Sequence, residues 1–385
     1  MPLSSRQILE KLVSFKTVSR DSNLELVDWV QGYLEDQGIK SHRLPSDDGT
    51  KSALFAQVGP DELGGIVLSG HTDVVPVDGQ SWSNDPWTLT ERDGKLHGRG
   101  ACDMKGFDAL AIEALVRAKE APLQRPLQIA LSYDEEIGCA IAAPLVQAMA
   151  KVLPKAAIAI VGEPSMMKVV TGHKGNDGYR VHVKGYEMHS SLMHRGVNAI
   201  MEGARLIDWA NRTNARLGSL DPNPVAAAFE PPWTTVHVGT ISGGTAANIT
   251  AKDCRFSLDF RFVPSDDPDA LKAEFIEEVA AIQSEMQNVH TDTGIEVVPH
   301  FGVPALKPET NGAAEELTRK LTGDNGTHVV SYATEAGHFQ NAGYSTVVCG
   351  PGNIAQAHQP DEFITLQQLA ACEDFLKRVV HHLCQ

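Results

Sequence analysis

The segment that most constrains the fold is a short apolar run, Gly65 to Leu68. A run of this length bounded by glycine is typical of a strand buried on both faces of a parallel sheet. After Gly70, His71 and Asp73 follow one residue apart, and in an extended chain such residues face the same side. Open α/β sheets bind ligands at the carboxyl ends of their strands, so the pair predicts a binding site there. A solvated turn is the alternative interpretation.

Strand-like runs alternate with helical patterns over the first part of the chain. The strand-like runs cover residues 53–58, 65–68, 127–131 and 156–161, and the helical patterns cover 24–37, 104–119 and 140–149. This alternation predicts a largely parallel sheet with crossover helices. The stretch from 307 to 385 returns to the same alternation and ends in a helix.

The pattern changes near residue 177, where strands with a two-residue period begin. These strands cover 178–184, 234–241, 254–262 and 295–301, with helical stretches at 197–211 and 267–287. The order strand-helix-strand-strand-helix-strand predicts an α+β, ferredoxin-like domain. We therefore expect an α/β protein with a mainly parallel-sheet catalytic domain, residues 1–176 and 304–385, and an inserted dimerisation or lid domain, residues 177–303.

Composition restricts the possible partners. The 385 residues carry a formal charge of −16, which argues against nucleic acid and anionic membranes but not against a cationic substrate. We expect no membrane span and no signal peptide, because apolar runs are short and charged residues interrupt the helical pattern of residues 1–18. The six cysteines have no framework spacing, which favours reduced thiols and a cytoplasmic protein.

A glycine-rich loop, residues 98–106, surrounds Asp103. Its spacing fits neither the P-loop nor the dinucleotide fingerprint, so a phosphate site is rejected. Glycines let a backbone pack closely around an acidic side chain that precedes a helix. Asp103 is therefore either a ligand or an ordinary helix N-cap.

Acidic residues also follow two other predicted strands. Asp134, Glu135 and Glu136 come after the run at 127–131, and such neighbours repel one another unless cations neutralise them. Glu163 follows the run at 156–161. The alternatives are a solvated acidic loop for the first group and a helix-start turn for the second.

His358, in a loop near the C-terminus, completes the candidate ligands. Two histidines and three carboxylates match a paired divalent site of mixed nitrogen and oxygen ligands. Glu135 is then left beside a ligand, where it could act as general base on water.

These motifs resemble those of the M20 co-catalytic zinc peptidase/deacylase family over nearly the whole chain. The resemblance rests on residues 69–76, 98–106, 134–136, 162–164, 173–175, 189–191, 195–200 and 350–352. It implies two zinc ions per chain, with cobalt or manganese also possible. Asp103 would bridge them, His71 and Glu163 would complete one position, and Glu136 and His358 the other.

The resemblance also implies catalytic roles. Asp73 would orient His71, and Glu135 would be the general base on a water that bridges the two zinc ions. The family often has a cis peptide after the bridging aspartate, here Asp103–Met104. After the acidic turn, this chain has Cys139 where close relatives differ.

The inserted domain would add further residues to the active site. His189 would reach the site of a partner subunit, although Met188 replaces the family's usual glycine, and His194 is a second candidate. Asn248 and Arg261 would bind the substrate carboxylate, which a guanidinium holds bidentately. For Arg261, a surface salt bridge fits equally well.

Pairing of inserted domains would give a homodimer. An exposed edge strand, either 178–184 or 234–241, is expected to allow it.

The implied function is removal of the acetyl group from an N-acetylated amino acid. The negative charge and Glu335 favour a cationic side chain, with ornithine as the preferred product. The alternatives are a desuccinylase of succinyl-diaminopimelate, a broad N-acyl-amino-acid deacylase and a non-enzymatic binding protein. The sequence 334–336 argues against the first, and the complete ligand set argues against the last.

Overall fold

The computed structural model describes residues 2–385, which divide into two compact units. The first unit contains the chain up to Gly172 together with Leu306–Val329 and Thr334–Gln385. The second contains His173–Ala305 and Val330–Ala333.

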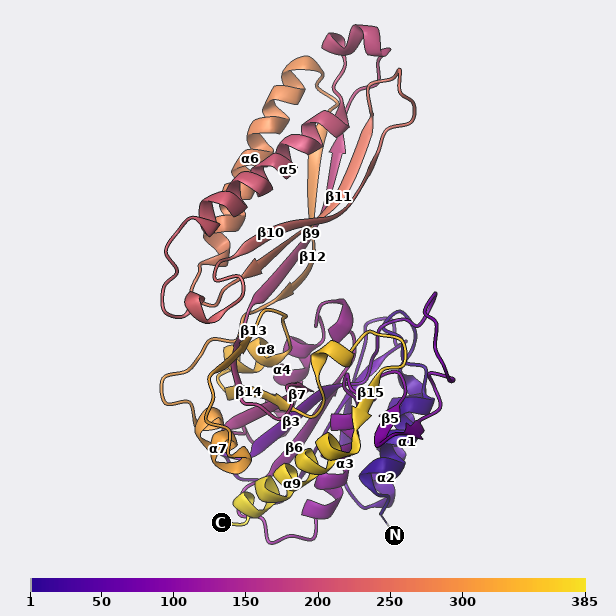
Figure 1. The fold of residues 1–385 in the computed structure, drawn as a ribbon, viewed down its shortest axis with the longest axis vertical. Coiled ribbons are helices and arrows are strands. Elements are labelled where there is room, and N and C mark those ends of the chain that lie inside the picture. The colour runs from indigo at the N-terminus through magenta and orange to yellow at the C-terminus, as the bar shows by residue number, and fades with distance from the viewer. Residues whose placement is uncertain (1) are drawn as a thin grey trace. The chain divides into compact units, whose positions relative to one another are not determined.

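An eight-stranded sheet forms the centre of the first unit, in the order β1-β2-β6-β3-β7-β14-β8-β13 (Figure 1). The strands are β1 (Ser41–Pro45), β2 (Ser52–Val58), β3 (Ile66–His71), β6 (Leu127–Ser132), β7 (Ile158–Pro164), β8 (Val170–His173), β13 (His328–Val330) and β14 (Ser345–Gly350). The four neighbours β6, β3, β7 and β14 are parallel, whereas β1, β2 and β8 pair antiparallel. The predicted mainly parallel α/β sheet is confirmed.

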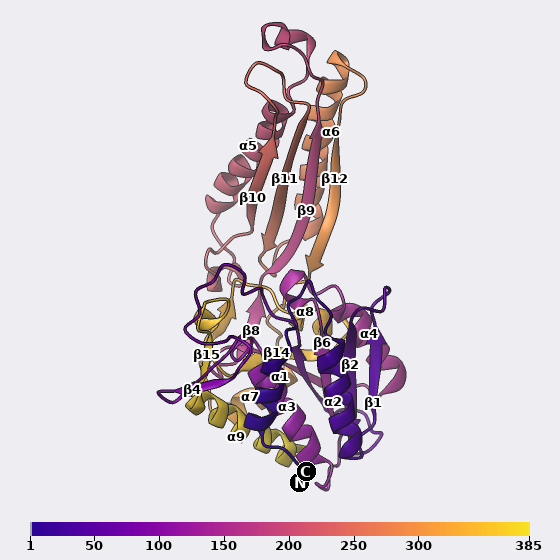
Figure 2. The same cartoon turned by 90° about the vertical axis from the view of Figure 1, so that its right-hand side faces the viewer.

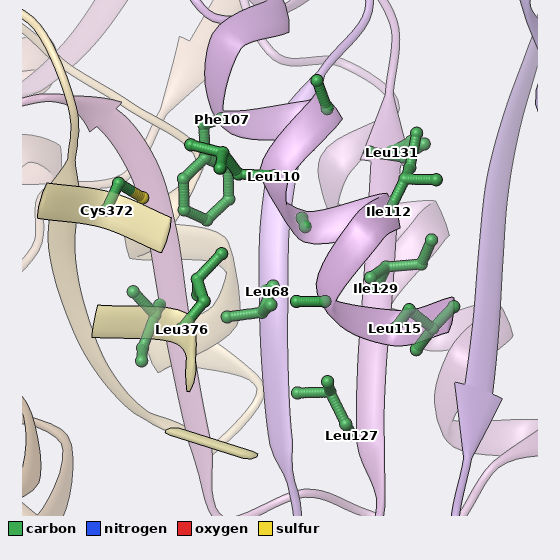
Figure 3. Packing of buried hydrophobic residues seen from close by; sticks show 14 of the residues in the cluster. Leu68, Phe107, Leu110, Ile112, Leu115, Leu127, Ile129, Leu131, Cys372 and Leu376 are labelled. Carbon is green, nitrogen blue, oxygen red and sulfur yellow. The ribbon is translucent and has the colours of Figure 1, made fainter. Parts of the chain in front are cut away.

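Helices cover this sheet, and the most deeply buried of them is α3. The helices are α1 (Ser5–Ser14), α2 (Leu24–Asp36), α3 (Lys105–Ala118), α4 (Ala142–Val152), α7 (Ala313–Thr322), α8 (Ala336–Asn341) and α9 (Leu366–Leu383). Every residue of α3 except Glu113 and Arg117 is buried, because the helix packs against α1, α9 and the central strands. Figure 3 shows Phe107 and Leu110 of α3 beside Cys372 and Leu376 of α9 in this core.

A second, three-stranded sheet joins distant parts of the first unit. Its strands are β4 (Thr90–Arg92), β5 (Lys95–His97) and β15 (Phe363–Thr365), in the order β15-β5-β4. Pairing of β5 with β15 brings the chain after residue 97 next to the chain before residue 363. The loops that carry Asp103 and His358 therefore meet.

The second unit is an antiparallel sheet of order β10-β11-β9-β12 with two helices on one face (Figure 2). Its elements are β9 (Gly175–Lys184), α5 (Ala199–Gly218), β10 (Thr235–Gly243), β11 (Asp253–Phe262), α6 (Pro268–Val289) and β12 (Gly294–Val303). Trp209, Phe260 and Phe275 fill the layer between sheet and helices, with ring centroids 5.2 to 6.4 Å apart. This is the expected ferredoxin-like βαββαβ order.

The sheet order corrects one expectation about its edges. Strand β9 pairs with β11 on one side and β12 on the other, so 178–184 is interior and cannot be an edge. Strand β10, which contains 235–241, is an edge strand, and its Ile241 side chain is 54% exposed.

A histidine on α8 makes stability depend on pH. Burial lowers the pKa of His338 to about 4, and its Nε2 atom has no hydrogen-bond partner within residues 2–385. The unfolded chain therefore binds more protons than the folded chain between pH 4 and pH 6.5. The contribution of neutral His338 to the free energy of unfolding is therefore fully present above pH 6.5 and is lost as the pH falls toward about 4.

We predict that His338→Leu removes this pH dependence. Relative to the variant, the wild-type chain should lose up to about 3 kcal/mol of unfolding free energy between neutral pH and about pH 4. Urea unfolding of chelator-treated protein at several pH values measures the difference. Parallel pH profiles for the two proteins would contradict the prediction.

Candidate metal centre

The candidate ligands gather at the carboxyl ends of the parallel strands. His71 ends β3 and lies opposite Ser132, the last residue of β6, so the turn that follows Ser132 is adjacent to it. Glu163 lies near the end of β7, on the other side of β3. Parallel pairing therefore brings together residues that are distant in the sequence.

Close packing behind the strand ends depends on two glycines. A Cβ atom at Gly70 would collide with the Asp108 carboxylate, and one at Gly162 would overlap the Phe107 ring. Both opposing side chains belong to α3, the helix that begins at Lys105, two residues after Asp103. The two glycines therefore let α3 lie close to the strands, which brings Asp103 next to the strand ends.

The His71 ring lies within 3.9 Å of three carboxylates. Its Nε2 atom is 3.1 Å from Asp103 Oδ1, 3.6 Å from Glu163 Oε1 and 3.9 Å from Glu135 Oε2. Donor atoms of His71, Glu135 and Glu163 could surround one cation, as could those of His71, Asp103 and Glu136.

The second histidine contacts the opposite side of the same aspartate. His358 Nε2 is 3.4 Å from Asp103 Oδ2 and 3.0 Å from Glu136 Oε2. Asp103 thus lies between two imidazoles, one on each carboxylate oxygen. The peptide bond that follows it, Asp103–Met104, is cis.

Asp73 contacts both His71 and the acidic turn, residues 134–136. Its Oδ1 atom is 3.4 Å from His71 Nδ1 and accepts a hydrogen bond from the Glu135 backbone N–H. Its Oδ2 atom accepts from the Glu136 backbone N–H and from the Ser19 hydroxyl, the latter at 2.6 Å. The sequence predicted the contact with His71 but gave no signal for Ser19.

Burial and mutual repulsion control the charges of these groups. Burial, reinforced by Asp103, raises the pKa of Glu136 to about 7 and that of Glu163 well above its usual range. Burial also raises the pKa of Glu135 well above its usual range. Hydrogen bonds to Asp103 and Glu136 raise the pKa of His358 to about 10. The cluster thus has more carboxylates than its two imidazoles can neutralise, so burial disfavours their full ionisation unless cations are present.

The residues fit a pair of divalent cations. Glu136 Oε1 and Glu163 Oε1 are buried without a hydrogen-bond partner anywhere in the described chain. Such oxygens cost free energy unless a cation or another group satisfies them. Carboxylate oxygens mixed with imidazole nitrogens suit zinc and neighbouring first-row metals.

Glu335 is buried beside β3. It is 1% exposed, and the Ser69 hydroxyl lies 3.4 Å from Glu335 Oε2. Burial raises the pKa of Glu335 to about 7, and its Oε1 atom lacks a partner among residues 2–385. Its role in substrate binding stays a prediction.

Three other predicted site residues belong to the second unit. The exposed His189 precedes a short 3₁₀ helix and binds Ser191. The carbonyl oxygen of Asn248 accepts a hydrogen bond from the Ser190 N–H. Arg261 Nε lies 4.0 Å from Asp259 Oδ2, a contact that matches the surface salt-bridge alternative. Their functional roles stay predictions.

Sequence reasoning assigned no site contact to Cys139, Glu362 or Arg99. Cys139 Sγ lies 3.5 Å from Glu135 Oε1. Glu362 accepts hydrogen bonds from the backbone of the Asp103 loop and pairs with Arg99. No local spacing marks these residues, because their partners come from other segments of the chain.

Comparisons with known proteins identify the family to which the chain belongs. A model of peptidase family M20/M25/M40 matches residues 67–382. Acetylornithine deacetylase of Myxococcus xanthus is 34% identical over 391 residues, covering 98% of this chain and 97% of the relative. Acetylornithine deacetylase of Yersinia pestis is 35% identical over 372 residues, covering 94% and 92%.

Solved structures share the fold. A metallo-carboxypeptidase of the M20 family from Sulfolobus solfataricus superposes with a TM-score of 0.78 at 18% identity, covering 99% of each chain. A dinuclear metal-binding peptidase of the M20 family from Bacillus subtilis gives a TM-score of 0.65 at 16% identity, covering 98% of this chain and 97% of the other.

Fold, site and relatives together define a metal-dependent hydrolase that acts on amides. The chain belongs to the M20/M25/M40 peptidase family, as its motifs indicated. Within residues 2–385, no helix has the length and apolar character needed to span a membrane, and no disulfide joins the six cysteines.

We predict that the purified chain binds about two divalent ions and loses activity when a chelator removes them. His71→Ala and His358→Ala should each reduce the content to about one ion, because each imidazole contacts a different oxygen of Asp103. Elemental analysis of dialysed protein measures the content. Active wild-type enzyme without metal would contradict the assignment.

Proposed function

We propose that this protein removes the acetyl group from N2-acetyl-L-ornithine, giving L-ornithine and acetate, as a step of arginine biosynthesis. The observation that carries the proposal is identity of 34–35% with acetylornithine deacetylases over nearly the whole chain. Clustering of all the predicted metal ligands in the first unit supports it.

Two zinc ions, or cobalt or manganese in their place, would be held by five side chains. Asp103 would contact both ions, His71 and Glu163 would complete one position, and Glu136 and His358 the other. When bound, such ions polarise an amide carbonyl and lower the pKa of water.

Glu135 would act as general base. Its carboxylate lies 3.9 Å from His71 Nε2, and burial raises its pKa well above the usual range. A carboxylate of this kind can accept a proton from water as the water oxygen bonds to the acetyl carbon. It can then return the proton to the amine nitrogen when the carbon–nitrogen bond breaks.

Asp73 would act as a positioning residue. Its carboxylate accepts hydrogen bonds from the backbone N–H groups of Glu135 and Glu136 and also contacts the His71 ring. One buried carboxylate therefore fixes the general base relative to both candidate metal positions.

Three further side chains would recognise the substrate. Arg261 and Asn248 would bind the α-carboxylate, and Glu335 would favour the cationic side chain of ornithine. We further propose a cytoplasmic homodimer in which His189 stabilises the oxyanion in the partner's site, with His194 as the other candidate.

Two related activities are the rival functions. A desuccinylase of succinyl-diaminopimelate and a broad N-acyl-amino-acid deacylase would need the same metal ligands. Measuring kcat/KM for acetylornithine, succinyl-diaminopimelate and acetylmethionine under identical conditions separates them. Preference for either of the last two substrates would overturn the assignment to acetylornithine.

We predict that Glu135→Ala lowers kcat by at least about 10²-fold, the lower range for loss of a general base. Metal content should stay near the wild-type value, because Glu136 supplies the neighbouring ligand. Glu113→Gln, on the buried helix α3, is the control and should retain near-normal kcat. Normal turnover by Glu135→Ala would exclude the assigned role.

A second prediction concerns the dimer. Mixing inactive Glu135→Ala chains with inactive His189→Ala chains should restore activity, because a mixed dimer has one site with both residues intact. Random exchange gives half mixed dimers, each with one active site, so about a quarter of wild-type activity is expected. Exchange without recovery would show that His189 does not act across the interface.

A further inference from the structure

A buried ion pair links the loops that carry Asp103 and His358. Arg99 Nη1 donates a 2.6 Å hydrogen bond to Glu362 Oε2, and each residue is 1% exposed. Burying two charges costs free energy that good geometry and additional hydrogen bonds must offset. The partners of Glu362 Oε1 and Arg99 Nη2, the atoms outside this hydrogen bond, therefore show which segments the ion pair positions.

The second oxygen of Glu362 holds the backbone beside the bridging aspartate. Glu362 Oε1 accepts hydrogen bonds from the Cys102 N–H at 2.9 Å and from the Asp103 N–H at 3.1 Å. Rotation of this carboxylate would move the backbone that carries Asp103.

The second arm of Arg99 reaches the loop of His358 through a glutamine. Arg99 Nη2 donates to Gln80 Oε1 at 2.6 Å, and Gln80 Nε2 donates to the His358 carbonyl oxygen at 2.8 Å. The guanidinium also lies over the Trp82 ring, 5.0 Å from its centre, in a cation–π contact. A continuous chain of hydrogen bonds thus connects the backbones of the two ligands.

His358 depends on this support more than His71 does. His71 is buried and is held by Asp73 through its second ring nitrogen. The His358 side chain is 51% exposed, and its backbone has a φ of 63°, a conformation that non-glycine residues seldom adopt. The hydrogen bond from Gln80 to the His358 carbonyl therefore constrains a ligand that its own surroundings leave less fixed.

We propose that Gln80, held in place by the Arg99–Glu362 ion pair, positions His358 and so sets the affinity of the metal position made by Glu136 and His358. The inference rests on the proposed two-metal site and adds residues that touch neither metal nor substrate. The ion at His71 and Glu163 does not depend on Gln80, because Asp73 orients that histidine.

The test uses Gln80→Met, which keeps the side-chain length and removes the side-chain hydrogen bonds to Arg99, His358 and Trp82. Gln340→Met is the matched control, because Gln340 also donates to a backbone carbonyl, that of Lys307, at 2.8 Å. Competition of the full-length chain with a zinc chelator gives the two dissociation constants. We expect Gln80→Met to weaken one ion by about 10-fold or more, as supporting contacts to ligands do, and Gln340→Met to weaken neither.

Combination with ligand variants identifies the affected ion. In the His71→Ala background, the remaining ion should be weakened by Gln80→Met. In the His358→Ala background, the same substitution should change nothing, because the position it supports is already lost. Arg99→Lys should also weaken the ion at Glu136 and His358. An ammonium group cannot bind Glu362 and Gln80 together as the planar guanidinium does.

A purely structural role predicts a different result, namely unchanged dissociation constants with lower thermal stability. Wild-type affinities in Gln80→Met, or equal weakening of both ions, would overturn the inference while the two-metal site stands. A wild-type chain that binds no zinc would overturn the inference together with the proposed function, and the wild-type measurement alone reveals that case.

Discussion

The rest of the site depends on the Asp103 carboxylate, which is buried between two imidazoles. His71 contacts one oxygen and His358 the other, while Glu135, Glu136 and Glu163 lie around them. Desolvated like charges repel strongly, so such a cluster persists only where hydrogen bonds and cations compensate it. That electrostatic demand explains both the fit to divalent metals and the dense contacts that surround the ligands.

The fold meets this demand with two kinds of support. Parallel strands bring His71, the acidic turn and Glu163 to one edge of the sheet, and Asp73 accepts the backbone N–H groups of the turn. The small sheet of β5 and β15 then joins the loops of Asp103 and His358. The first support orients the half of the site at His71, and the second orients the half at His358.

Prediction from sequence succeeded where local pattern carries the information. Strand length, glycine spacing and ligand chemistry coincide within a few residues: apolar runs precede His71 and Glu163, and a glycine-rich loop surrounds Asp103. The same reasoning failed for 178–184, which is interior, because the order of strands in a sheet is not their order in the chain. It also missed Gln80, whose partner His358 lies 278 residues further along.

The sequence by itself determined the α/β class, the ferredoxin-like insertion and the family, and it predicted the candidate ligands, because each depends on periodicity or on short motifs. Tertiary structure alone decided that Arg99 and Glu362 tie two ligand loops together and that Cys139 contacts Glu135. Those contacts arise from chain segments packed by the hydrophobic core, and a single sequence carries no periodic signal for them. Burial then determines how strong these contacts are, because hydrogen bonds and charge interactions are strongest where water is excluded.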